Sequence, residues 1–250
     1  MQPTPIRTLL AVLGVIVPGS ALAFGTQFTI APPPLGHPVY EKGQVQYRAG
    51  ATVRHYGSEG TDLTGSTLGL SRRQTLSDRF AFNVGGQADY LSGTEYVVSP
   101  DNDLHLWRVM LHVTGEYQQR FTPGWNAILF AGPEAGYGEY EVTYRPFLSP
   151  GKERINGKET LSGYIVGLQT SVKAGTLRIT PFLSYEGLGS HATEDRTAGN
   201  SRTTDRAIAI TQYGAEVLFR GGLTLGITFQ HWSSGGDEER YRLYQVGYQF

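Results

Sequence analysis

A histidine and a serine separated by one residue, His231 and Ser233, are the residues of this chain best suited to chemistry. On a β-strand, side chains two positions apart point to the same face, so the imidazole and the hydroxyl would lie on one side. A histidine placed in this way can accept the proton of a serine hydroxyl as the hydroxyl attacks an ester carbonyl. A carboxylate is then needed to orient the imidazole, and Asp237, Glu238 and Glu239 follow directly. The spacing predicts nucleophilic attack on an ester.

The elements that must position this pair are strands with apolar residues at every second position. The segment that carries the pair alternates through Leu223, Leu225, Ile227 and Phe229, and the run 244–250 alternates to the final residue, Phe250. An apolar face with period two, closing on a terminal aromatic, is typical of bacterial outer-membrane β-barrels. Because Glu238 shares the parity of Phe250, we expect it on the same face as the histidine and serine if the strand extends that far.

The same alternation recurs along the whole chain. It predicts strands near residues 45–53, 63–73, 80–90, 107–117, 127–131, 164–168, 177–185, 213–219, 223–229 and 244–250. Short turns at 72–78, 121–124, 173–176 and 220–222 alternate with longer polar loops at 92–103, 144–159 and 189–206. We therefore predict an all-β fold, a closed antiparallel transmembrane up-and-down barrel of about ten strands, with short periplasmic turns and long external loops. Counts of eight or twelve remain alternatives because the strand at 63–73 is faint.

The N-terminal region predicts export. Arg7, the apolar run 9–17 and Ala21-Leu22-Ala23 have the layout of a cleaved signal peptide over residues 1–23. Residues 24–43 are rich in proline and predict an extended periplasmic lead-in, which leaves 44–250 for the barrel. We expect an integral protein of the outer membrane of a Gram-negative cell. A net charge of −1 gives no reason to expect a nucleic-acid partner.

The opposite, lumen-facing side of the strands carries charges of both signs. Mixed charges in a narrow barrel favour pairing and a filled interior over a single-sign pore. The residues placed on this side by parity are Arg48, Arg54, Arg79, Asp89, Arg108, His112, Glu116, Arg120, Arg178, Glu186, Glu216 and Arg220. A narrow pore for small solutes remains an alternative.

The segment Phe229-Gln230-His231-Trp232-Ser233, which precedes a glycine pair, resembles a known family. A His-x-Ser at the end of the penultimate strand is similar to that of the outer-membrane lipid A 3-O-deacylases, and the outer-membrane phospholipases share a related pair. The resemblance implies a pair on the outside of the barrel, with His231 as the base, Ser233 as the nucleophile and Glu238 as the acid. The alternative interpretation is a rim histidine and serine among lipid headgroups, with Trp232 a large side chain at that level.

Two main functional classes follow. The first is a non-enzymatic surface or structural barrel with a largely filled lumen, whose external loops contact partners. The second is a lipid esterase. In both, we expect outer-membrane lipids and lipopolysaccharide as partners, together with the barrel-assembly machinery through the strand ending at Phe250. We expect no cofactor and no metal, because the short acidic run at 101–103 has the composition of a turn rather than of a calcium loop.

Overall fold

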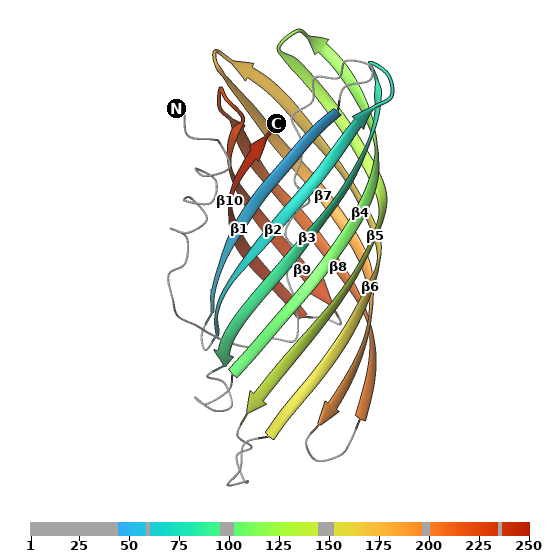
Figure 1. Ribbon diagram of the computed structural model, residues 1–250, viewed down its shortest axis with the longest axis vertical. Helices are drawn as coiled ribbons and strands as arrows, with labels where there is room; N and C mark the ends of the chain where they lie inside the picture. Colours follow the sequence, from blue (N-terminus) through green and yellow to red (C-terminus); the bar gives the residue numbers. More distant parts are fainter. Residues whose placement is uncertain (1–44, 59–60, 96–102, 145–152, 197–200, 235–236) are drawn as a thin grey trace, which may run out of the picture.

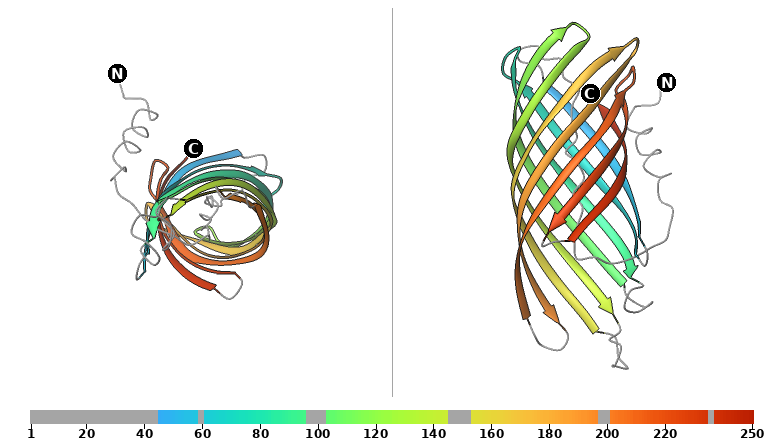
Figure 2. Two further views of the ribbon diagram at one scale, coloured as in Figure 1. Left: turned by 90° about the horizontal axis from the view of Figure 1, so that it is seen from below. Right: turned by 180° about the vertical axis from the view of Figure 1, so that it is seen from behind.

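The computed structural model describes residues 45–58, 61–95, 103–144, 153–196, 201–234 and 237–250. These form one closed barrel of ten antiparallel strands, in which each strand pairs with its neighbours in sequence and β1 closes on β10 (Figures 1 and 2). The strands are β1 (Val45–Ser58), β2 (Thr61–Thr75), β3 (Phe80–Glu95), β4 (Asp103–Thr122), β5 (Trp125–Tyr144), β6 (Glu153–Ala174), β7 (Leu177–Arg196), β8 (Ser201–Leu218), β9 (Leu223–Ser234) and β10 (Asp237–Gln249).

The predicted up-and-down barrel of ten strands is confirmed, and the alternatives of eight and twelve are wrong. The faint strand near 63–73 is β2, which pairs along its whole length with β1 and β3. The predicted signal peptide (1–23) and the proline-rich lead-in (24–43) lie outside the described residues. Within the described part of the chain, no helix is long and apolar enough to cross a membrane.

The outer surface of the barrel is apolar and suited to contact with lipid. Its aliphatic side chains stay exposed; Leu111, for example, is 62% exposed. Two aromatic girdles flank this belt, as in transmembrane barrels. The girdle near the short turns comprises Tyr47, Phe80, Tyr117, Phe121, Trp125 and Phe250, and the girdle near the long loops comprises Tyr90, Trp107, Tyr137, Tyr164, Tyr185, Tyr213, Phe229 and Tyr244.

The terminal residue closes the barrel. Tyr47 and Phe250 exchange two backbone hydrogen bonds of 2.9 and 3.0 Å, and their rings stack with centroids 6.0 Å apart. The C-terminus lies at the end of the barrel with the short turns, which is uppermost in Figure 1. At these turns Gly175, Gly221 and Gly222 have positive φ, a conformation that glycine adopts without steric cost.

The core of the molecule is its lumen. Toward the long loops an apolar layer fills it, and every member is at most 8% exposed: Met110, Leu161, Leu188, Ile208, Ile210, Trp232 and Leu243. Also in the lumen, Arg108 lies 3.0 Å from Asp89, which accepts a 2.5 Å hydrogen bond from Thr67. Glu186, fully buried, accepts a hydrogen bond from Gln212. The described side chains at this level of the lumen are therefore buried against one another, as in narrow barrels whose interior is filled by side chains.

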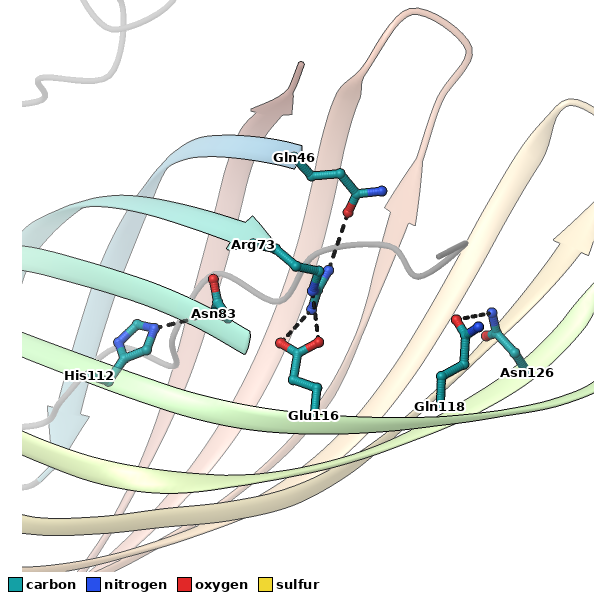
Figure 3. A network of polar contacts seen from close by, with 7 residues as sticks. All are labelled: Gln46, Arg73, Asn83, His112, Glu116, Gln118 and Asn126. Atoms are coloured by element: carbon teal, nitrogen blue, oxygen red, sulfur yellow. Dashed lines mark hydrogen bonds and ion pairs between the residues drawn. The ribbon is translucent and has the colours of Figure 1, made fainter. Parts of the chain in front are cut away.

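Toward the short turns the lumen is polar (Figure 3). Arg73 binds Glu116 through two nitrogen–oxygen contacts of 2.7 and 2.8 Å and reaches Gln46 at 3.4 Å. Asn83 and His112 lie 3.5 Å apart, and Asn126 donates to Gln118 at 3.4 Å. The predicted pairing of lumen charges is thus seen at Arg108–Asp89 and at Arg73–Glu116.

Three arginines assigned by parity to the lumen face are not part of this packing. Arg79, Arg120 and Arg220 are exposed at the end with the short turns. Each lies at a strand end or in a turn, where the side chain can reach water even if its backbone register points inward. Alternation predicts the face of a residue but not whether the barrel wall still encloses it.

The barrel wall has two heights at the end with the long loops, which is the lower end in Figure 1. We call β5–β8 the tall wall and β9, β10 and β1 the low wall. The tall wall reaches well below the low wall in that view, consistent with 22 residues in β6 and 12 in β9. The prediction of a loop at 189–206 is wrong because the tall wall continues there as strand: β7 runs to Arg196 and β8 begins at Ser201.

Candidate functional site on the outer wall

His231 and Ser233 both lie on the outer face of β9. Burial along this strand alternates, with Thr228, Gln230, Trp232 and Ser234 buried toward the lumen. The histidine and the serine occupy the positions between them, on the side of the exposed Leu225. The face predicted from the sequence is therefore the face on which the structure places them. Their catalytic roles stay a prediction.

Trp232 does not lie at headgroup level on the outside. It is 1% exposed and belongs to the apolar layer of the lumen. The interpretation of Trp232 as a rim side chain beside the histidine is wrong, because the period of two that turns His231 outward must turn its neighbour inward.

The pair sits just beyond the girdle near the long loops. Tyr213 and Phe229 stack across β8 and β9 with centroids 5.4 Å apart. His231 is the next outward residue of β9, and Ser233 follows it one residue before the strand ends. Aromatic girdles mark the level of lipid headgroups, so the pair is at the depth where ester groups of lipids would lie.

Cross-strand neighbours define what could assist this pair. His231 is in register with Thr211 on β8 and with Arg240 on β10. Ser233 is in register with Glu238, whose side chain lies outside what the structure describes. The residue directly across from the imidazole is therefore an arginine, and the predicted acid would have to reach the imidazole diagonally. Diagonal neighbours in an antiparallel pair are about 7–8 Å apart between Cα atoms, within reach of a long side chain.

Arg240 and Arg242 are the residues of this region that sequence reasoning missed. Both are exposed, and both share the outward parity of Tyr244, Val246 and Phe250. The available signal was this parity itself, which places two arginines on a face that is otherwise apolar.

Two other histidines whose side chains the structure describes lie on the outer face. On the tall wall, His191 Nδ1 is 2.6 Å from a carboxylate oxygen of Asp205, its register partner on β8. On β4, His105 Nδ1 is 3.3 Å from the hydroxyl of Tyr90. His191 and Asp205 both lie in a range that was predicted to be loop. Their spacing in the sequence therefore could not predict that they pair. Within the described residues, no group of three or more histidine or acidic side chains could hold a metal ion.

No protein-family model matches this chain, and no curated protein sequence shows significant similarity to it. Solved structures are similar in fold. The translocator domain of the autotransporter NalP from Neisseria meningitidis covers 84% of this chain and 90% of its own length, at 13% identity and a TM-score of 0.51. The outer-membrane protease OmpT from Escherichia coli covers 82% and 96%, at 11% identity and a TM-score of 0.52. The chain has the fold of an outer-membrane β-barrel. At such identities the likeness is one of architecture alone.

Proposed function

We propose that this protein is an integral outer-membrane barrel that does not conduct solutes and acts through its outer surface and its external rim. The observation that carries the proposal is the filled lumen. The apolar layer and the buried Arg108–Asp89 pair both lie inside the barrel wall. A solute would have to displace well-packed apolar side chains and separate a buried ion pair, both of which are costly.

The orientation follows from the connections between strands. Short turns face the periplasm in barrels of this kind, so the tall wall would project from the cell surface. Its outward positions are polar and would be available to surface partners. The lipid-facing belt would contact outer-membrane lipids and lipopolysaccharide, and the strand ending at Phe250 would serve recognition by the barrel-assembly machinery.

Planar-bilayer conductance of the purified barrel tests the proposal. We expect no stable conductance steps from the wild type. The Trp232→Gly variant removes the largest side chain of the apolar layer and serves as the positive control, for which transient openings are expected. Reproducible unitary steps from the wild type would contradict the proposal and favour the narrow-pore alternative.

A lipid esterase is the second candidate, and one observation favours it. His231 and Ser233 share the outer face one step beyond the Tyr213–Phe229 stack. In this proposal His231 accepts the Ser233 proton while the serine oxygen bonds to the acyl carbon, and it returns that proton to the alcohol that leaves as the ester C–O bond breaks. Water then hydrolyses the acyl-serine, and Glu238 orients the imidazole. The resemblance to lipid A 3-O-deacylases and outer-membrane phospholipases supports the same assignment.

Mass spectrometry of lipid A and phospholipids from expressing cells separates the two candidates. The esterase proposal expects acyl loss with the wild type and none with Ser233→Ala. Ser234→Ala is the matched control, because it removes a hydroxyl from the adjacent residue, which is 6% exposed and faces the lumen. Equal acyl patterns in cells with and without the wild-type protein would eliminate the esterase and leave the non-enzymatic barrel.

A further inference from the structure

We propose that Arg240 and Arg242 form a site on the outer face of β10 that binds the phosphate group of an anionic outer-leaflet lipid. The site concerns binding of a headgroup and does not require Ser233 to be a nucleophile. It deepens the lipid contact of the proposed non-enzymatic barrel and rests on the orientation proposed for it, and it is tested separately from conductance and from esterase activity.

The two arginines lie at the level of the girdle near the long loops. Arg242 is in register with Phe229, a member of the girdle near the long loops, and Arg240 is in register with His231 just beyond it. Both arginines are exposed on the outward face. Charges near the membrane interface cost little compared with charges at its centre, and long arginine side chains can reach toward the headgroups. The two guanidinium groups are therefore placed at the level of lipid phosphates.

The charges on the outer faces of the two walls are balanced differently. On the outer face of the tall wall each of three cationic or titratable groups has an acid beside it: Arg154 contacts Glu141, Lys158 lies 4.0 Å from Glu139, and His191 lies 2.6 Å from Asp205. Neither Arg240 nor Arg242 forms an ion pair with any acid whose side chain the structure describes. Among the described side chains, the low wall thus presents two positive charges without an acid beside them, which an external anion can neutralise.

The guanidinium groups of Arg240 and Arg242 are chemically suited to bind phosphate. A guanidinium offers planar, paired N–H donors that match two oxygens of a phosphate. Residues two apart on a strand lie about 6.6 Å apart along it, so both forks can approach one headgroup. A neutral or zwitterionic lipid would leave one or both charges uncompensated, whereas a phosphate monoester supplies up to two negative charges. This favours a phosphate-bearing lipid as the occupant.

Lipid retention by the full-length mature barrel in detergent micelles tests the proposal. The probes are diphosphoryl lipid A and the same lipid after removal of its phosphates, and native mass spectrometry measures the bound fraction. We expect the double variant Arg240→Gln/Arg242→Gln to retain the phosphorylated lipid at least ~10-fold less well, since it loses two charge-assisted contacts. The dephosphorylated lipid should bind weakly and equally to both proteins.

The matched control is Arg154→Gln/Lys158→Gln, which removes the same number of charges from the outer face of the tall wall. It should retain the phosphorylated lipid like the wild type. Heat-dependent electrophoretic mobility confirms that each variant is folded. An Arg240→Lys/Arg242→Lys variant, which keeps the charge but loses the paired donors, should fall between the wild type and the glutamine variant.

Four results would overturn the proposal. Equal retention by the double glutamine variant would show that these arginines do not bind the lipid. An equal loss in the tall-wall control would show a nonspecific effect of net charge. Displacement of the lipid by an equal concentration of inorganic phosphate would show a site for free phosphate. Retention that appears only after Glu238→Gln would show that an acid of the barrel already neutralises the arginines.

Discussion

The tall wall and the low wall differ in whether the charged side chains on their outer faces form ion pairs. Beyond its aromatic girdle the tall wall continues for 11 residues in β6, from Tyr164 to Glu153, which is about 36 Å along the strand. The low wall continues for 5 residues in β9, from Phe229 to Ser234. The first carries ion pairs on its outer face, whereas the second carries Arg240 and Arg242 without a described acid partner.

The inner faces of the two walls differ as well. On the tall wall Tyr140 packs over Gly157 and donates a 2.8 Å hydrogen bond to Glu194, and Ser190 donates to Glu159. These contacts join β5, β6 and β7 well beyond the girdle. The low wall ends with Trp232 and Ser234, which still belong to the packed lumen. The difference indicates that the tall wall is stabilised in water by its own side-chain contacts. The low wall remains at the membrane, where lipid headgroups can neutralise its arginines.

The largest effect is expected outside both walls, at the Arg108–Asp89 pair that joins β4 and β3 in the lumen. Both side chains are at most 1% exposed. The Arg108→Met variant would leave a buried carboxylate without its cation, so we expect it to lower the free energy of unfolding by about 3–5 kcal/mol. Urea unfolding in micelles, followed by tryptophan fluorescence, measures the change. A loss below about 1 kcal/mol would mean that the lumen is hydrated enough to screen the charge.

The next largest loss of stability is expected for a substitution within the tall wall. A methyl group at Gly157 would lie 2.0 Å from the Tyr140 ring, which is held in place by its bond to Glu194. We expect Gly157→Ala to cost about 2–3 kcal/mol through overpacking and the lost hydrogen bond. The control is Gly189→Ala on β7, where the added methyl meets its nearest atom at 3.7 Å.

Lipid retention by the low wall should be unchanged in both glycine variants. The same micelle unfolding experiment, combined with the lipid assay, checks this separation. If Gly157→Ala weakened lipid binding as much as it weakened folding, the two walls would not be independent regions.

The smallest effect is expected for the outer ion pairs of the tall wall. Arg154 is 55% exposed and Lys158 is 71% exposed, so water and salt screen their attraction to the acids. Replacing either with Gln should change the free energy of unfolding by less than about 1 kcal/mol. A larger loss, measured at 0.15 M salt by urea unfolding, would show that these pairs hold the wall together rather than neutralise its surface.

The sequence was sufficient for the membrane-spanning part of the fold. Alternation of apolar residues located all ten strands, and it placed His231 and Ser233 on the outer face. It failed beyond the girdles, because both faces of a strand are polar there and the period of two disappears while the backbone ladder continues. Residues 189–196 and 201–206 were therefore predicted as loop, although they form the hairpin of β7 and β8.

The candidate site could be predicted from the sequence only in part, for a related reason. Parity predicts which face a residue occupies, but the cross-strand neighbour depends on register. The register places Arg240 opposite His231, and it places Asp205 opposite His191. Neither pairing could be read from spacing along the chain, because the turn lengths that set them were not known.

A depth measurement tests the central claim, that the low wall meets lipid and the tall wall stands in water. The chain has no cysteine, so Ser233→Cys and Asn156→Cys each provide one labelling site on the outer face of β9 and β6. A fluorophore at each site is measured in vesicles that contain lipids with a nitroxide at the headgroup. We predict strong quenching and blue-shifted emission at position 233, with neither at position 156. Equal quenching at the two positions, or its absence at both, would contradict the account.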